Sequence, residues 1–230
     1  MKKDFAVIFD LNGTLVDTEI AHGKAYREVL KKHGIEFSLP DFSDHWTRQG
    51  KKLADYLTKI ERHDLLHLEK DLVKEKDQIF DSSFAANSTL MPFARETLSS
   101  LKHEGFILGA DSSTSRDNLE KLLKHFELFD FFDILTSRDT PFEESEYGDH
   151  KSKTARLKFL VDSIKLPAYR VAMVGDAEKD IQGANRAGIK AIAVPNKDTA
   201  NNNFNLADKV VKDLSEITSE LILSLLNPWQ

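Results

Sequence analysis

Residues 5–18 read FAVIFDLNGTLVDT, and this stretch decides the fold. An apolar run, Phe5–Phe9, is followed directly by Asp10, and Gly13 and Thr14 come shortly after it. Apolar runs of this length without polar alternation are typical of strands buried on both faces of a sheet. A polar loop with a glycine directly after such a strand is where α/β proteins bind ligands. We therefore predict a buried first strand whose carboxyl end carries functional side chains.

Four further short apolar runs have the same character, namely Phe106–Ala110, Phe132–Leu135, Val171–Val174 and Ala191–Val194. Between them, apolar residues recur at helical spacing, as at Leu157, Leu160, Val161 and Ile164. Strands that alternate with helices indicate a parallel sheet covered on both faces. The sequence therefore predicts an α/β fold with a Rossmann-like, doubly wound parallel sheet.

The segment between the first two predicted strands is far longer than one crossover helix requires. It is predicted to be nearly all helix, with helices over about residues 20–30, 51–59 and 65–84. Helical spacing returns in the tail, at Leu214, Ile217, Leu221, Ile222 and Leu225. We expect residues 1–16 and 90–230 to form a catalytic core, with residues 17–89 inserted after the first strand as a helical cap.

The composition is that of a soluble globular protein, with 40% hydrophobic and 30% charged residues among 230. The chain has no cysteine, which excludes a disulfide framework and a thiolate nucleophile. A net charge of −6 argues against a nucleic-acid partner. The apolar run at the N-terminus is too short for a signal peptide, and none of the runs approaches a membrane span. We expect a cytoplasmic protein without a membrane partner.

Polar side chains follow three of the predicted strands. They are Asp10 after the first, Asp111-Ser112-Ser113-Thr114 after the second, and Gly175-Asp176, with Asp180 nearby, after the fourth. Lys151 and Lys153 precede the helix that leads into the fourth strand. These groups should meet at one edge, because the carboxyl ends of parallel strands lie together.

Each residue type at this edge has a chemical use. Paired carboxylates suit a hard cation such as Mg²⁺, and hydroxyls with a lysine suit a phosphate. A carboxylate beside a bound phosphate can attack it and form an aspartyl-phosphate. Any one of these residues alone is as well explained as a helix cap or a solvated charge. Their joint placement at successive strand ends favours the functional interpretation.

These motifs resemble those of the haloacid dehalogenase (HAD) superfamily. Residues 9–18 resemble its first motif, DxDGT; Ser112 resembles the second; Lys151 or Lys153 resembles the third; and residues 175–180, GDAEKD, resemble the fourth. The resemblance covers essentially the whole chain. The helical insert resembles the cap of the phosphoglycolate phosphatase and β-phosphoglucomutase branch, which closes over small substrates.

The resemblance implies a role for each matching residue. Asp10 would be the nucleophile and a metal ligand, Asn12 would offer its backbone carbonyl, and Asp176 would complete the Mg²⁺ site. Asp180 would orient the lysine or a metal-bound water. Ser112, with the N–H that follows it at Ser113, would hold the phosphate. Gly13 would allow close backbone approach, and Thr14 would brace the loop.

The lysine of the third motif has two candidates, because either spacing from Asp176 occurs in the family. We favour Lys153, which lies next to Thr154, the expected capping residue of the following helix. In the insert, three residues are candidates for binding substrate: His22, Arg48 and Lys51. Packing at the domain junction for His22, and a solvated helix start for the other two, are equally compatible with the sequence.

Asn12 departs from the family pattern. The phosphatases and mutases of this branch have a second aspartate there, which protonates the leaving group and then activates water. Three explanations compete: an engineered Asp-to-Asn variant, a natural protein with weak hydrolase activity, or chemistry that needs no acid there. The dehalogenases lack that acid, but Asp176 and Asp180 argue against that branch.

The resemblance thus implies a Mg²⁺-dependent phosphatase that acts on a small phosphorylated metabolite. One alternative is a β-phosphoglucomutase-like phosphomutase, which depends even more on the missing acid. The other is a catalytically weak homologue that binds a phosphorylated ligand or a protein.

Overall fold

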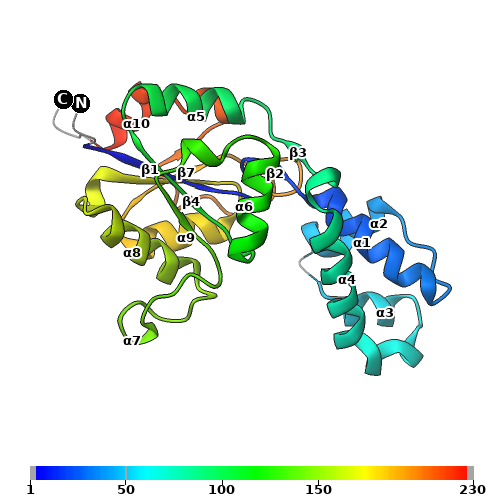
Figure 1. Cartoon of the computed structure of the whole chain (residues 1–230). Coiled ribbons are helices and arrows are strands. Elements are labelled where there is room, and N and C mark those ends of the chain that lie inside the picture. Colours follow the sequence, from blue (N-terminus) through cyan, green and yellow to red (C-terminus); the bar gives the residue numbers. More distant parts are fainter. Residues whose placement is uncertain (1–3, 50, 227–230) are drawn as a thin grey trace. The chain divides into compact units, whose positions relative to one another are not determined.

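The structure is a computed structural model that describes residues 4–49 and 51–226. The chain divides into two compact units (Figure 1). One unit, the core unit, comprises the chain up to Val16 and from Leu90 onward, and the other, the helical unit, comprises Asp17–Thr89. The chain passes between them through two short strands, β2 (Val16–Asp17) and β3 (Thr89–Leu90), which pair with each other.

The core unit contains a six-stranded sheet within the described residues, in the order β5-β4-β1-β6-β7-β8. Its strands are β1 (Ala6–Asp10), β4 (Ile107–Asp111), β5 (Ile134–Thr136), β6 (Val171–Gly175), β7 (Lys190–Ala193) and β8 (Lys209–Val210). All five pairings are parallel. The first strand therefore lies in the interior of the sheet, between β4 and β6, and all five of its residues are buried.

Helices cover both faces of this sheet (Figure 1). On one face, α8 (Lys153–Ile164) and α9 (Glu178–Ala187) pack Leu157, Leu160 and Ile181 against Ile8 and Met173 of the sheet. On the other lie α5 (Ala94–His103) and α10 (Ser219–Leu226). Two further helices, α6 (Arg116–His125) and α7 (Glu144–Tyr147), belong to the connections that follow β4 and β5. The predicted doubly wound α/β fold is confirmed.

Each strand that ends at the site edge runs further than its apolar run. β1 and β4 extend to Asp10 and Asp111, which pair with each other in the register of the two strands. β6 extends to Gly175 and so presents Asp176 immediately after it. The sheet thus places three acidic residues at the ends of three adjacent strands.

The helical unit contains α1 (Glu19–Lys32), α2 (Leu39–Phe42), α3 (Leu53–Lys59) and α4 (Glu69–Ser83). Its core is aromatic and aliphatic, with Tyr26, Leu30, Leu57 and Leu72 all buried. The helix expected over residues 65–84 starts at Glu69, because residues His63–Leu68 wind as a 3₁₀ turn instead.

The tail also differs from the expectation. Leu214 lies in a 3₁₀ turn, Leu214–Glu216, and Ile217 follows it, so that only the later residues belong to α10. The sequence analysis did not predict β8, since both of its residues are exposed and form no apolar run. Within residues 4–49 and 51–226, none of the helices has the length and apolarity that crossing a bilayer requires.

Candidate active site

Three buried carboxylates come together at the carboxyl edge of the sheet. Asp10 ends β1, Asp176 follows β6, and Asp180 lies in the first turn of α9. One oxygen of each lies within 4.8 Å of the others. Their exposed fractions are 5%, 5% and 0%. Asp180 also caps its own helix, because Oδ2 accepts a hydrogen bond from the backbone N–H of Ala177 at 3.1 Å.

The loop after β1 is tied to Asp176. Gly13 has a φ of +90°, and a Cβ there would lie 2.6 Å from Oδ2 of Asp176, so only glycine allows this approach. Thr14 donates from Oγ1 to Oδ1 of Asp176 at 3.0 Å. Asn196 donates from Nδ2 to Oδ2 of Asp176 and to the carbonyl oxygen of Gly13, both at 3.0 Å. Both oxygens of Asp176 therefore have a donor.

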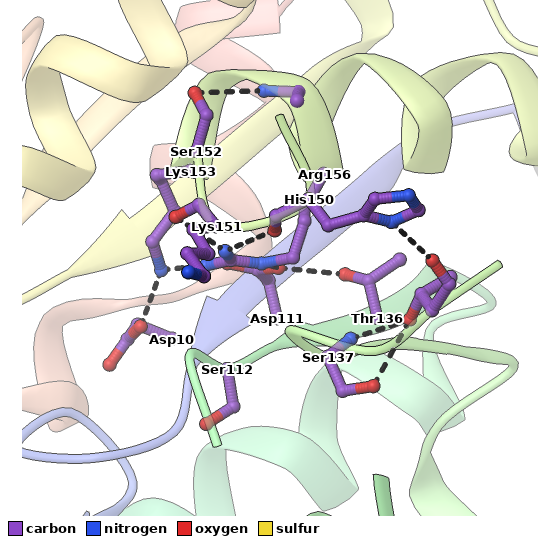
Figure 2. Close-up of polar contacts among 12 residues, drawn as sticks. Asp10, Asp111, Ser112, Thr136, Ser137, His150, Lys151, Ser152, Lys153 and Arg156 are labelled. Atoms are coloured by element: carbon purple, nitrogen blue, oxygen red, sulfur yellow. Dashed lines mark hydrogen bonds and ion pairs between the residues drawn. The ribbon is translucent and has the colours of Figure 1, made fainter. Parts of the chain in front are cut away.

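Lys153 is the lysine that reaches this cluster (Figure 2). Its ammonium lies 2.5 Å from Oδ1 of Asp10 and 3.0 Å from Oδ1 of Asp180, and its side chain is 9% exposed. The side chain of Lys151, in contrast, belongs to an exposed residue with no ion pair to the cluster. The geometry therefore selects Lys153 over Lys151.

The cap of α8 differs from the expectation. Ser152 occupies the N-cap, and its Oγ accepts a hydrogen bond from the backbone N–H of Ala155. Thr154 lies inside the first turn of the helix and is not the cap. Serine can accept the capping hydrogen bond as well as threonine can. With Ser152 as the N-cap, the helix begins at Lys153.

Ser112 lies beside Asn12. Its hydroxyl donates to Oδ1 of Asn12 at 3.0 Å and accepts a hydrogen bond from the backbone N–H of Thr114 at 3.2 Å. Ser112 is fully buried, whereas Ser113 is exposed. The first and second motifs are thus in direct contact, through the amide that replaces the family's aspartate.

Sequence reasoning missed two partners of this site, Asp111 and Arg156. The sequence places Asp111 at the end of a predicted strand without indicating a role, and it indicates none for Arg156. Lys153 lies 2.8 Å from Oδ2 of Asp111. Arg156 is 1% exposed and donates from Nε and Nη2 to the two oxygens of Asp111 at 2.7 and 3.1 Å (Figure 2). One signal was available: Arg156 follows Lys153 by three residues, which places the two on one helical face.

Burial and charge shift the pKa values of these groups. Burial raises the pKa of Asp10 to about 6, although Lys153 opposes the shift. Burial, with the nearby charges of Asp10 and Asp180, raises the pKa of Asp176 to about 7. Burial also disfavours ionised Asp111, but Lys153 and Arg156 outweigh it and hold that pKa below its usual range.

A divalent cation fits this donor set. The pKa values of Asp10 and Asp176 are raised mainly because burial disfavours the ionised carboxylates, and repulsion from neighbouring carboxylates adds to the shift; a cation would offset both effects. Carboxylate oxygens are the ligands that hard cations such as Mg²⁺ prefer. The structure groups Asp180 with Asp10 and Asp176, so it is a third candidate beside the predicted carbonyl of Asn12.

The three candidates in the helical unit have separate surroundings. His22 stacks on Phe80, with ring centroids 3.9 Å apart, and burial lowers its pKa to about 3. Lys51 is exposed. The side chain of Arg48 and the neighbouring Gly50 lie outside what the structure describes. Their role in binding substrate stays a prediction.

The fold and this edge define a class of protein: a Rossmann-like α/β protein with a buried acidic site at the carboxyl ends of its strands. The sequence model of the haloacid dehalogenase-like hydrolase family matches residues 7–194. The chain belongs to that family.

Two of the relatives are phosphatases by name. The chain is 27% identical over 233 residues to hexitol phosphatase B of Escherichia coli, with 95% of this chain and 96% of that protein covered. It is 25% identical over 199 residues to phosphoglycolate phosphatase of Aliivibrio fischeri, with 82% of each covered.

A solved structure shares the fold. The structure of CbbY from Rhodobacter sphaeroides in complex with phosphate matches with a TM-score of 0.72 at 21% identity, and covers 96% of this chain and 100% of that one.

Proposed function

We propose that this chain is a Mg²⁺-dependent phosphatase that hydrolyses a small phosphomonoester through an aspartyl-phosphate on Asp10. The observation that carries the proposal is the contact between Lys153 and Asp10, 2.5 Å from Nζ to Oδ1, inside a cluster of buried carboxylates. The buried ammonium of Lys153 can bind an anionic phosphoryl group right next to the carboxylate of Asp10. The phosphatase relatives support the same chemistry.

The first step transfers the phosphoryl group to the protein. An oxygen of Asp10 forms a bond to phosphorus while the bond from phosphorus to the ester oxygen breaks, and the electron pair leaves with that oxygen. Lys153 holds the phosphoryl oxygens by its charge, and the backbone N–H of Ser113 donates a hydrogen bond to them, while the hydroxyl of Ser112 stays on Asn12. Asp10 and Asp176, with Asp180 or the Asn12 carbonyl, would hold a Mg²⁺, which would supply positive charge to offset the charge that develops.

The second step regenerates Asp10. Water attacks phosphorus, the bond to the Asp10 oxygen breaks, and inorganic phosphate leaves. Each step needs a proton at the right place: the departing alcohol oxygen takes one up, and the attacking water gives one up. Asn12 can do neither, because a carboxamide neither gives up nor takes up a proton as an acid or base near neutral pH.

Asn12 therefore determines the rate that we expect. General acid–base catalysis contributes about 10²–10⁴-fold, so its loss leaves a slow enzyme whose protons come from solvent. The Asn12 side chain stays in hydrogen-bond contact with Ser112 at 3.0 Å, so the site keeps its shape. This contact also favours the second candidate function, a weakly catalytic protein that binds a phosphorylated ligand in an intact pocket.

The test is phosphate release from p-nitrophenyl phosphate, phosphoglycolate, sugar phosphates and nucleotides, with and without millimolar Mg²⁺. We expect slow release that requires Mg²⁺ and disappears in Asp10→Asn. Mass spectrometry after exposure to a reactive phosphate donor should show a phosphate adduct on Asp10. If neither the wild-type chain nor Asn12→Asp releases phosphate from any ester, the ligand-binding alternative replaces the phosphatase.

A further inference from the structure

We propose that Asp111 and Arg156 are positioning residues that hold the ammonium of Lys153 in place throughout phosphoryl transfer. The proposal rests on the function proposed above, because it concerns the lysine of that site. The proposal adds two charged residues, Asp111 and Arg156, which act on the reacting groups only through Lys153.

Both oxygens of the Asp111 carboxylate are occupied by hydrogen-bond donors. Oδ1 accepts from Nε of Arg156 at 2.7 Å and from the hydroxyl of Thr136 at 2.9 Å. Oδ2 accepts from Nη2 of Arg156 at 3.1 Å and lies 2.8 Å from Nζ of Lys153. Asp111 is completely buried at the end of β4. Because three donors from Arg156 and Thr136 hold this carboxylate, it is a fixed ionic partner for the ammonium of Lys153.

Arg156 connects the Asp111 carboxylate to the segment of chain that carries Lys153. Besides its fork to Asp111, Arg156 donates from Nη1 to the carbonyl oxygens of His150 and Lys151, each at 3.1 Å (Figure 2). These carbonyls belong to the segment that enters α8 just before Lys153. Arg156 therefore clamps the start of that helix to the end of β4, and both ends of the Lys153–Asp111 contact are secured.

Of its three carboxylate partners, Lys153 keeps Asp111 throughout the reaction. It contacts Asp10, Asp111 and Asp180 at rest. Asp10 and Asp180 belong to the carboxylate group that fits a cation, and Asp111 does not. Phosphorylation of Asp10 also converts its carboxylate into a mixed anhydride with phosphate, which ends its role as a full ionic partner. Asp111 is then the partner whose charge is shared with neither the cation nor the phosphoryl group.

A flexible four-carbon stem needs such a partner. Lysine is a point charge on rotatable bonds, so its charge must be held where the transition state develops. A displacement of about 1 Å at a reacting group can cost about 10²-fold in rate. We therefore expect loss of the pair to lower kcat more than it changes KM.

The experiment compares variants in an Asn12→Asp background, where turnover is expected to be measurable. The double variant Asp111→Asn/Arg156→Gln removes both buried charges together, which avoids an unpaired one. Arg156→Lys keeps the charge but loses the two-pronged fork. Thr97→Val is the control for general loss of stability: its buried hydroxyl donates to the Leu214 carbonyl at 2.8 Å and lies outside the site. Steady-state kinetics, vanadate affinity and thermal melting are measured for each.

We expect the double variant to lose about 30- to 100-fold in kcat with KM within about threefold, and Arg156→Lys to fall between it and the parent. Vanadate should bind the double variant more weakly than it binds the control. A kcat within about threefold of the Thr97→Val control would overturn the proposal and leave the pair a purely structural one. If the double variant does not fold, a folded Arg156→Lys with unchanged kcat overturns it equally.

The two proposals fail separately. The parent is assayed first, with Asp10→Asn beside it. A parent without Mg²⁺-dependent turnover contradicts the phosphatase function, whereas a working parent with unaffected variants contradicts only the positioning role.

Discussion

The side-chain nitrogen of Asn196 lies 3.0 Å from Oδ2 of Asp176 and donates a hydrogen bond to it. The same nitrogen donates to the carbonyl oxygen of Gly13, so one amide joins the fourth motif to the first. Its own Oδ1 accepts from the backbone N–H groups of Asp198 and Thr199, which orients it. Asn196 thus holds a predicted metal ligand without touching the other carboxylates of the cluster.

We expect Asn196→Ala to weaken Mg²⁺ binding by about 10- to 100-fold, the usual cost of losing a residue that orients a metal ligand. Isothermal titration calorimetry with Mg²⁺ measures it. Asn185→Ala is the matched control, because that amide donates only to the carbonyls of Ile181 and Leu206 among the described contacts. Equal affinities in the two variants would contradict the role of Asn196.

The raised pKa values of Asp10 and Asp176 predict a pH dependence of metal binding. At about 6 and about 7, these groups hold protons that a cation must displace. Mg²⁺ affinity should therefore fall as pH decreases through 7 and then 6, by up to about tenfold per unit for each proton released. Titrations in buffers of different ionisation enthalpy count these protons. An affinity that is flat from pH 8 to pH 5.5 would show that the cation binds elsewhere.

The same shifts predict the stability of the metal-free chain. Both carboxyls have folded pKa values above the ordinary value of 3.8, so the folded state binds more protons than the unfolded state between about pH 4 and pH 7. Their contribution to the free energy of unfolding falls as pH rises through that window. Urea unfolding with and without Mg²⁺ checks this, and added Mg²⁺ should flatten the slope.

Asn12→Asp should raise turnover by about 10²-fold or more, because it restores a group that can give and accept a proton. The gain should depend on the leaving group: large for alkyl phosphates and small for aryl phosphates whose phenols are acidic. Plots of log kcat/KM against leaving-group pKa should be steep for the wild-type chain and shallow for the variant. Parallel plots would place the missing catalysis elsewhere.

Lys153→Ala should abolish tungstate and vanadate binding, whereas Lys151→Ala should leave it within about twofold, since an exposed surface charge contributes little. The two lysines are two residues apart on one segment, so each variant is the control for the other. Tungstate protection against thermal unfolding is the measurement. Equal losses would contradict the selection of Lys153 by the geometry.

Gly183→Ala separates activity from stability. A Cβ at Gly183 of α9 would lie 2.6 Å from Cγ of Lys153, so the lysine stem would have to move. Alanine favours a helix over glycine by about 1 kcal/mol, which offsets part of the strain. We expect a clear loss of kcat with a melting temperature that changes little. An Ala variant with full kcat would show that the stem tolerates displacement.

The central part of the fold was predictable because its physical signal is local. Short apolar runs mark β1, β4 and β6, and the parallel arrangement follows from the helices between them. The placement of Asp10 and Asp176 follows in turn, since strand ends in such a sheet share an edge. β8 could not be predicted in this way, because its two residues are exposed and pair through their backbone.

The remaining parts of the site depend on contacts between distant segments. The spacing of Arg156 from Lys153 places the two on one helical face but does not identify its partner, Asp111, which lies 45 residues away. Asn196 lies in a polar loop and meets Gly13, 183 residues away, only after the sheet has formed. The choice between Lys151 and Lys153 likewise needed the true helix start, which Ser152 provides.

Because β1 lies in the interior of the sheet, the sheet can form around it only after later parts of the chain have been synthesised. The first strand emerges early from the ribosome, but both of its neighbours, β4 and β6, follow much later in the chain. At about 5–20 residues per second, Asp10 waits on the order of ten seconds or more before Asp176 exists. During that interval the apolar strand Ala6–Asp10 lacks its partners and is a natural client for a chaperone. The helical unit, whose residues are contiguous in sequence, has no such delay. Synthesis of β6, rather than local collapse, is therefore the event that lets the catalytic edge assemble.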